Sequence, residues 1–175
     1  MENAEIFQNA RLVKVRLQEV DDRDRTFALC WPGERGVEEL AAGIGTSGVI
    51  APVWVAGEEK GGDFFLVDGF RRVAAARRAG IEVLPAELLP GDLDPVKLFR
   101  ARLAGQGARL SAVEASRVLE KLKTQFRVGE STLVETFLPL LGLGRARPLL
   151  EQCLGLSALE EPVARYCAEN RVGLA

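Results

Sequence analysis

The chain has 175 residues, of which 47% are hydrophobic and 27% charged, and this balance is typical of a folded protein with one domain or two small ones. Its formal charge is −2, from 23 basic and 25 acidic side chains, so no overall positive field attracts polyanions. Histidine is absent, which excludes Ser-His and Cys-His nucleophiles and zinc sites built on imidazole.

The beginning of the chain predicts a strand and then a short helix. Residues 12–17 alternate between apolar and basic side chains over most of their length, which is the period of a half-buried strand. Apolar side chains then recur at helical spacing over residues 37–44. We expect Gly45 and Gly48 to end this helix, because glycine is the usual residue just past a helix C-terminus.

The next segment predicts a pair of strands followed by a helix and a further strand. Residues 50–55 and 64–67 are rich in β-branched and aromatic side chains, and the polar segment 58–63 between them predicts a turn. The helix is expected over residues 68–80, where Asp68 supplies a capping residue and a glycine the stop. Residues 81–89 predict the further strand.

The chain changes character near residue 105, after which every pattern is helical. Ser111 and Glu114 have the spacing of a capping box. Four helices are predicted here, separated by Pro139, Gly142, Gly144 and Gly155, over residues 111–122, 130–138, 147–154 and 157–169. The predicted fold is therefore α+β: a small mixed sheet with helices in residues 1–105, then an all-helical module in residues 106–175.

The junction between the strand at 64–67 and the following helix is a candidate anion site. Unpaired backbone N–H groups at a helix N-terminus favour anions, and the positive end of the helix dipole disfavours Arg71 and Arg72 in the first turn. A bound phosphate would offset that repulsion. An ion pair with Asp68 or simple solvation would also do so, and the spacing leaves these alternatives open.

Residues 37–53 and 66–75 together resemble the N-terminal domain of the ParB/sulfiredoxin-like superfamily. The shared pattern is a helix ending in glycine, a strand opening with Gly-x-x-x-Pro, a hairpin and a glycine-arginine-arginine box at a helix start, within residues 11–90. The resemblance implies CTP as a cofactor and a nucleotide-controlled clamp on DNA. It assigns nucleotide binding to Gly48, Pro52, Asp68, Gly69, Arg71 and Arg72.

Several positions depart from the family pattern. Phe70 stands where the box has glutamate, Ala74 where it has a third arginine, and Ala51 where the family has glutamine. The Glu-Asn-x-x-Arg element would fall on Leu103, Ala104 and Gly107. Magnesium-dependent CTP hydrolysis is therefore not expected, no metal site is predicted, and the cysteine and histidine of sulfiredoxin have no counterpart in the box.

The helical module resembles the ParB DNA-binding region: residues 110–122 are similar to its first helix, and residues 140–147 loosely resemble its helix-turn-helix. Arg145 and Arg147 precede or open a predicted helix, where basic side chains would contact DNA phosphates. A solvated loop is the alternative interpretation, and Glu151 on the same helix opposes a polyanion. Residues 106–175 carry 9 basic against 8 acidic side chains, so any attraction to DNA must be local.

The function that the sequence predicts is that of a non-enzymatic, ParB-like DNA-binding protein of the chromosome or plasmid partition type. Its expected partners are double-stranded DNA, a partition ATPase and a second copy of the chain. The alternatives are a nucleotide-dependent phosphotransfer enzyme and a protein-interaction module without nucleotide. The three cysteines are expected to be buried thiols, and a cytoplasmic location without membrane contact is expected, since the chain has no long apolar run and no signal sequence at its start.

Overall fold

A computed structural model of the chain describes most of its residues, namely 9–29, 36–49, 51–57, 64–90, 93–105, 110–170 and 172. Some sequence predictions fall outside these residues. They concern the turn at 58–63, Cys30, Ile50 and Gly107. They stay predictions.

The first unit is built on a five-stranded mixed sheet with the order β1-β5-β3-β4-β2. The strands β1 and β5, and likewise β3 and β4, are antiparallel, whereas β3 pairs with β5 and β2 with β4 in parallel. The strands are β1 (Arg11–Arg16), β2 (Val20–Asp21), β3 (Val53–Gly57), β4 (Phe64–Asp68) and β5 (Val83–Leu89), with a 3-10 turn η1 (Leu17–Glu19) after β1. The predicted small mixed sheet is confirmed.

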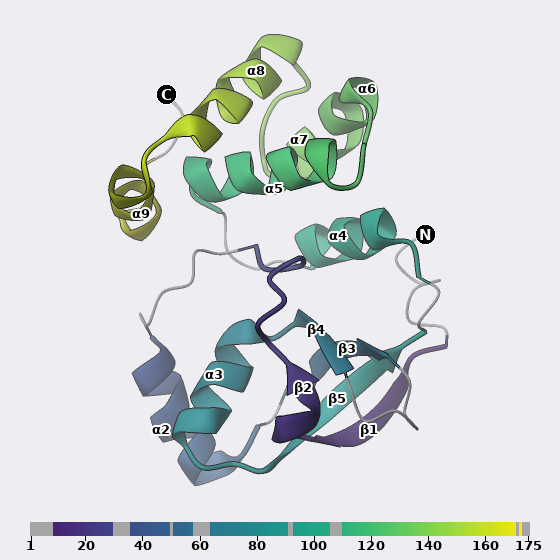
Figure 1. Cartoon of the computed structure of the whole chain (residues 1–175), viewed down its shortest axis with the longest axis vertical. Helices are drawn as coiled ribbons and strands as arrows, with labels where there is room; N and C mark the ends of the chain where they lie inside the picture. Colours follow the sequence, from purple (N-terminus) through teal and green to yellow (C-terminus); the bar gives the residue numbers. More distant parts are fainter. Residues whose placement is uncertain are drawn as a thin grey trace. The chain divides into compact units, whose positions relative to one another are not determined.

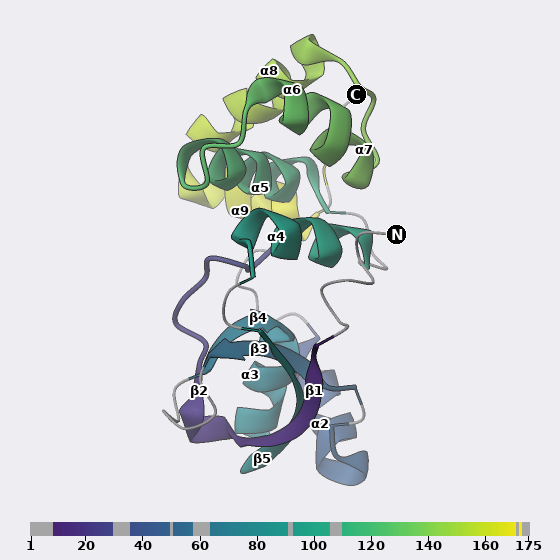
Figure 2. The ribbon, with the colours of Figure 1, turned by 90° about the vertical axis from the view of Figure 1, so that its right-hand side faces the viewer.

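Two helices lie side by side in this unit, and one of them packs on the sheet (Figures 1 and 2). They are α2 (Val37–Ser47) and α3 (Phe70–Arg78). Val73 and Ala76 of α3 join the core formed by the inward side chains of the strands, such as Val15 and Leu84. The opposite flank of α3 packs against α2, where Ala75 meets Ile44. The sheet and α2 thus hold α3 from two sides.

The second unit is helical and is organised around α5 (Ala112–Thr124), which contacts the helices that follow it (Figure 2). The Ser111 hydroxyl accepts from the Glu114 N–H at 3.3 Å, while the Glu114 carboxylate accepts from the Ser111 N–H at 2.8 Å, which confirms the predicted capping box. The other elements are α4 (Pro95–Ala104), α6 (Glu130–Thr132), the π-helical η2 (Leu133–Phe137), α7 (Leu138–Leu140), α8 (Arg147–Gly155), η3 (Leu156–Ala158) and α9 (Glu161–Glu169).

The division between the units comes after Asp94, earlier than the predicted position at residue 105. Helix α4 accounts for the difference between the two boundaries, because it lies between residues 94 and 105 and was not predicted from the sequence. Phe99 of α4 is fully buried and makes an edge contact with Phe126, with ring centroids 5.5 Å apart, so α4 belongs to the helical unit. The helix begins at Pro95, a first helical position where the missing N–H carries no penalty.

Three predicted helix ends differ in the structure. Helix α2 continues through Gly45 and stops only at Gly48, whose φ of 72° lies in the left-handed region. Pro139 does not separate helices, since α6, η2 and α7 form one continuous helical segment that contains it. The predicted helix over 157–169 is divided into η3 and α9, with Pro162 in the first turn of α9. Among the described residues, no helix is long and apolar enough to cross a membrane.

Ser116 of α5 is fully buried, and within the described part of the chain its hydroxyl oxygen has no hydrogen-bond partner. We expect Ser116→Ala to raise the free energy of unfolding by about 1 kcal/mol, because alanine removes an unsatisfied buried hydroxyl and has the higher helix propensity. Urea-induced unfolding measures this change. The control is Ser157→Ala, whose hydroxyl donates to the Leu154 carbonyl at 2.7 Å and whose removal should be destabilising. A Ser116→Ala variant less stable than the parent would contradict the prediction.

Candidate functional site

The junction between β4 and α3 is closed by Gly69, which is the N-cap residue of α3 and has a φ of +100°. A β-carbon on Gly69 would lie 2.6 Å from Cγ1 of Val53 and 3.3 Å from Nε of Arg72. Both the backbone angle and the lack of space therefore require glycine here. The predicted N-cap assignment of Asp68 is wrong: Asp68 is the last residue of β4, and the N-cap residue of α3 is Gly69, which has no side chain to donate or accept a capping bond.

Arg72 uses its guanidinium to bind the protein itself. Its Nη1 donates to the Ala51 carbonyl at 2.9 Å and also to the Pro52 carbonyl, and its Nη2 lies 3.1 Å from Oδ2 of Asp68. The side chain is only 24% exposed. Arg72 thus ties the start of α3 to the end of β4 and to the segment before β3. For this residue the structure bears out the ion-pair alternative.

Arg71 differs from its neighbour because its side chain is exposed. Within the described residues, it donates no hydrogen bond and forms no ion pair. A β-carbon on Gly36 would lie 2.6 Å from Nη2 of Arg71, so the guanidinium lies directly against this glycine. Since Gly36 is the N-cap residue of α2, the N-terminal ends of α2 and α3 lie close together, with Arg71 between them.

The other predicted nucleotide-site residues do not all lie in one place. Pro52, Asp68 and Gly69 meet around the Arg72 guanidinium. Gly48 ends α2, the helix that begins beside Arg71, and a β-carbon there would meet nothing within 4 Å. The structure therefore gathers three predicted residues around Arg72, leaves Arg71 open beside Gly36, and places Gly48 apart from both at the far end of α2.

Two residues near this junction were missed by the sequence analysis. One is Gly36, whose only signal was its place directly before a predicted helix. The other is Arg25, whose guanidinium carbon lies 5.1 Å above the centre of the Phe70 ring, a cation–π contact. Phe70 also packs against the sheet core. No sequence pattern links residues so far apart along the chain, so the contact required the fold.

The two predicted DNA-contacting arginines lie at the start of α8, and both are well exposed. Nε of Arg145 lies 3.7 Å from a carboxylate oxygen of Glu135 and donates to the Glu135 backbone carbonyl at 3.4 Å. Pro139 has no N–H with which to bond that carbonyl, so Arg145 satisfies an acceptor that the proline leaves free. Arg147 lies 3.2 Å from a carboxylate oxygen of Glu130 and 3.4 Å from one of Glu151.

The described cysteines are free thiols that differ in burial. Cys153 is fully buried, and burial raises the pKa of its thiol, while Cys167 is half-buried; both are free thiols. Among the described residues, no group of three or more His, Cys, Asp or Glu side chains could hold a metal ion. The described part of the fold therefore presents two places of interest, the β4–α3 junction and the start of α8.

A family model described as the ParB N-terminal domain matches residues 1–93, more than half of the chain. The chain belongs to the ParB N-terminal domain family. This confirms the resemblance found at residues 11–90, and the α+β prediction with it. The family model does not extend over α5 to α9, so the helix-turn-helix assignment of that region stays a prediction.

Two chromosome-partitioning relatives extend the similarity beyond the ParB N-terminal domain. The probable chromosome-partitioning protein ParB of Vibrio cholerae serotype O1 is 30% identical over 130 residues, covering 74% of this chain and 42% of that protein. The chromosome-partitioning protein ParB of Caulobacter vibrioides is 25% identical over 163 residues, covering 91% of this chain and 49% of that protein. The chain thus spans less than half the length of these curated relatives.

A solved structure shares the ParB fold. It is the C-terminally truncated chromosome-partitioning protein ParB of Caulobacter crescentus in complex with the centromeric parS site. It is 21% identical, with a TM-score of 0.52, and the match covers 90% of this chain and 78% of that chain. At this identity the likeness establishes the fold alone.

Proposed function

We propose that this chain is the nucleotide- and DNA-associating part of a ParB-like partition protein. The observation that carries the proposal is the position of Arg71, an exposed cation at the N-termini of two helices with no carboxylate partner among the described residues. Each helix dipole disfavours a cation at this end by about 0.3–1 kcal/mol, and a phosphate group would reverse that penalty.

The ligand proposed for this position is the phosphate chain of CTP. Arg71 and the first N–H groups of α2 and α3 would bind it, and Gly69 would allow close approach of the backbone. Gly48 lies at the opposite end of α2 and is not part of this phosphate position. Pro52, Asp68 and Arg72 would hold the framework without touching the nucleotide. The site does not fit magnesium, because Phe70 packs into the core and against Arg25 where the family has a carboxylate. We therefore propose binding without magnesium-dependent hydrolysis.

The test is CTP binding by isothermal titration calorimetry with Arg71→Ala. We expect the variant to lose at least about tenfold in affinity while its free energy of unfolding stays within about 0.5 kcal/mol of the parent. The control is Arg78→Ala in the last turn of the same helix, which removes an equal charge away from the helix N-terminus and breaks a pair with the exposed Glu38. Arg71→Ala binding CTP as tightly as the parent would refute the proposed pocket, and turnover of CTP would refute its non-enzymatic character.

The second unit would contribute the DNA contacts of the proposed function. The continuous helix of residues 130–140, the turn at 141–146 and α8 have the order of a helix-turn-helix, with α8 in the place of the recognition helix. Arg145 and Arg147 at its start would contact phosphates. Double-stranded DNA, a partition ATPase and a second copy of the chain are the proposed partners.

A further inference from the structure

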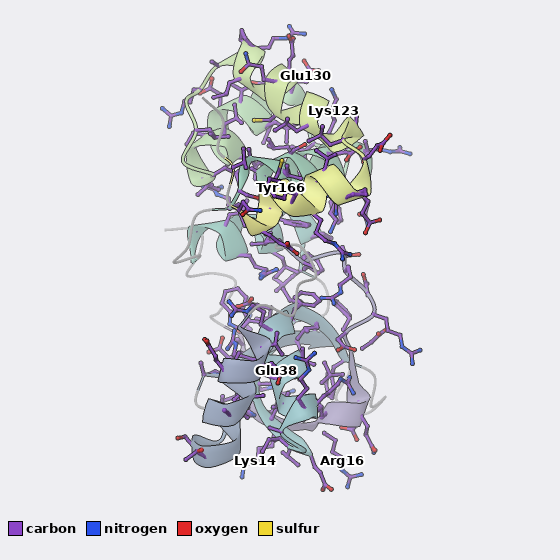
Figure 3. The ribbon with its side chains drawn as sticks, turned by 90° about the vertical axis from the view of Figure 1, so that its left-hand side faces the viewer. Lys14, Arg16, Glu38, Lys123, Glu130 and Tyr166 are labelled. Atoms are coloured by element: carbon purple, nitrogen blue, oxygen red, sulfur yellow. The ribbon has the colours of Figure 1, made fainter. Side chains whose placement is uncertain are left out.

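The carboxylate of Glu130 bridges two cations from different helices. Its Oε1 lies 3.2 Å from Nζ of Lys123 in the last turn of α5, and its Oε2 lies 3.2 Å from Nη2 of Arg147 at the start of α8. All three side chains are exposed, by 41%, 46% and 71% for Lys123, Glu130 and Arg147. Figure 3 shows Lys123 and Glu130 close together at the surface of the helical unit. One anion therefore already occupies the space between two cations.

The surroundings of this bridge are electrically balanced. Arg147 also pairs with Glu151 at 3.4 Å, and Arg145 with Glu135 at 3.7 Å. Three cations thus face three carboxylates, so these ion-paired side chains together carry no net charge. We call these six residues the α8 charge cluster: Lys123, Arg145, Arg147, Glu130, Glu135 and Glu151.

The position of Arg147 makes a bound anion favourable. Helix α8 has no acidic residue in its first turn, so its positive dipole end is not neutralised from within the helix. Glu130 supplies the missing negative charge from α6. A DNA phosphate, like the Glu130 carboxylate, can accept hydrogen bonds from two cationic side chains at once. Exposed ion pairs such as those of Glu130 stabilise the protein by only about 0–1 kcal/mol each. A phosphate can therefore displace the carboxylate at little cost.

We propose that Lys123 and Arg147 form a phosphate-binding pair for the DNA backbone and that Glu130 occupies this site as an internal competitor. This inference rests on the proposed DNA-binding function. It adds Lys123, a residue of α5 outside the helix-turn-helix segment, to the residues that contact DNA. It also explains how the α8 charge cluster, which has no net charge, would bind a polyanion, since phosphate replaces Glu130 between the two cations.

The experiment measures binding of a fluorescently labelled, random-sequence DNA duplex by anisotropy over a series of salt concentrations. We expect Glu130→Gln, which keeps the size of the side chain and removes its charge, to tighten binding about three- to tenfold at low salt. The slope of log affinity against log salt should steepen by about 0.9 for each phosphate newly neutralised. Lys123→Ala should weaken binding, and the gain from Glu130→Gln should vanish when Lys123 and Arg147 are also alanine.

The matched control is Glu160→Gln. Glu160 is an exposed carboxylate at the N-cap of α9, past the far end of α8, and its replacement changes the net charge equally. The inference is overturned if Glu130→Gln binds DNA no more tightly than Glu160→Gln. The proposed function still stands in that case, provided that the double variant Arg145→Ala with Arg147→Ala weakens binding. A parent protein without salt-dependent duplex binding would overturn the proposed function itself. Thermal unfolding of each variant verifies that the fold is kept.

Discussion

Gly69→Ala should lower the free energy of unfolding by at least about 2 kcal/mol, the largest effect expected of a single methyl group at the β4–α3 junction. One part of the cost is the φ of +100°, a conformation that costs other residues of order 1–3 kcal/mol. The other part is the 2.6 Å approach to Cγ1 of Val53, a fully buried side chain of β3 in the sheet core. Urea-induced unfolding followed by circular dichroism measures the loss.

The matched control for Gly69→Ala is Gly43→Ala in α2. Gly43 lies within the helix, and a β-carbon there would meet nothing within 4 Å, so alanine should stabilise the protein by about 0.5–1 kcal/mol. Val53→Ala should cost less stability in the Gly69→Ala background than in the parent, and the difference measures the part of the loss that comes from the steric clash. Gly69→Ala with parental stability would mean that the junction relaxes freely, contrary to the geometry described.

Arg72→Ala should destabilise the protein by about 2–3 kcal/mol, although Arg71, the residue before it in the sequence, makes no hydrogen bond or ion pair among the described residues. The variant loses hydrogen bonds to the Ala51 and Pro52 carbonyls and leaves Asp68 without this cation. Bonds that involve a charged partner contribute more than neutral ones, and Arg72 is mostly shielded from water. The free energy of unfolding from urea titration reports the effect.

Arg71→Ala is the matched control for Arg72→Ala, and we expect its stability to stay within about 0.5 kcal/mol of the parent. A double-mutant cycle between Asp68→Ala and Arg72→Ala should give a favourable coupling energy of about 0.5–1 kcal/mol, since the two side chains are only partly exposed. Equal stability losses from Arg71→Ala and Arg72→Ala would contradict the division of roles between the two arginines.

Local sequence patterns predicted most of the strands and helices of this protein. The strand at 12–17, the strands on either side of residues 58–63 and the helix after Gly69 all appear at or near the expected positions. These predictions succeed because the period of apolar side chains is set by the backbone geometry of each element. The capping box at Ser111 was predictable for a similar reason, since its partners lie within one helical turn.

Predictions failed where distant residues determine the outcome. Helix α4 joins the helical unit through the contact of Phe99 with Phe126, and local spacing gave no sign of that partner. Asp68 has the chemistry of a capping residue, but the pairing of β4 with β3 extends the strand through it. The continuation of a helix through Pro139 is different, because its cause is local: the π-helical turn η2 comes directly before the proline.

The amino-acid sequence by itself determined the α+β class, which residues form the glycine-arginine-arginine box, and the two basic residues at the start of α8. Only the tertiary structure decided what each charged side chain does. Arg71 and Arg72 are adjacent in sequence, yet one faces Gly36 and the other binds the carbonyls before β3. The physical reason is that successive residues of a helix point about 100° apart, so the surrounding fold gives neighbouring side chains different partners. Lys123, Glu130 and Arg147 meet for the complementary reason, because packing brings the ends of three helices together.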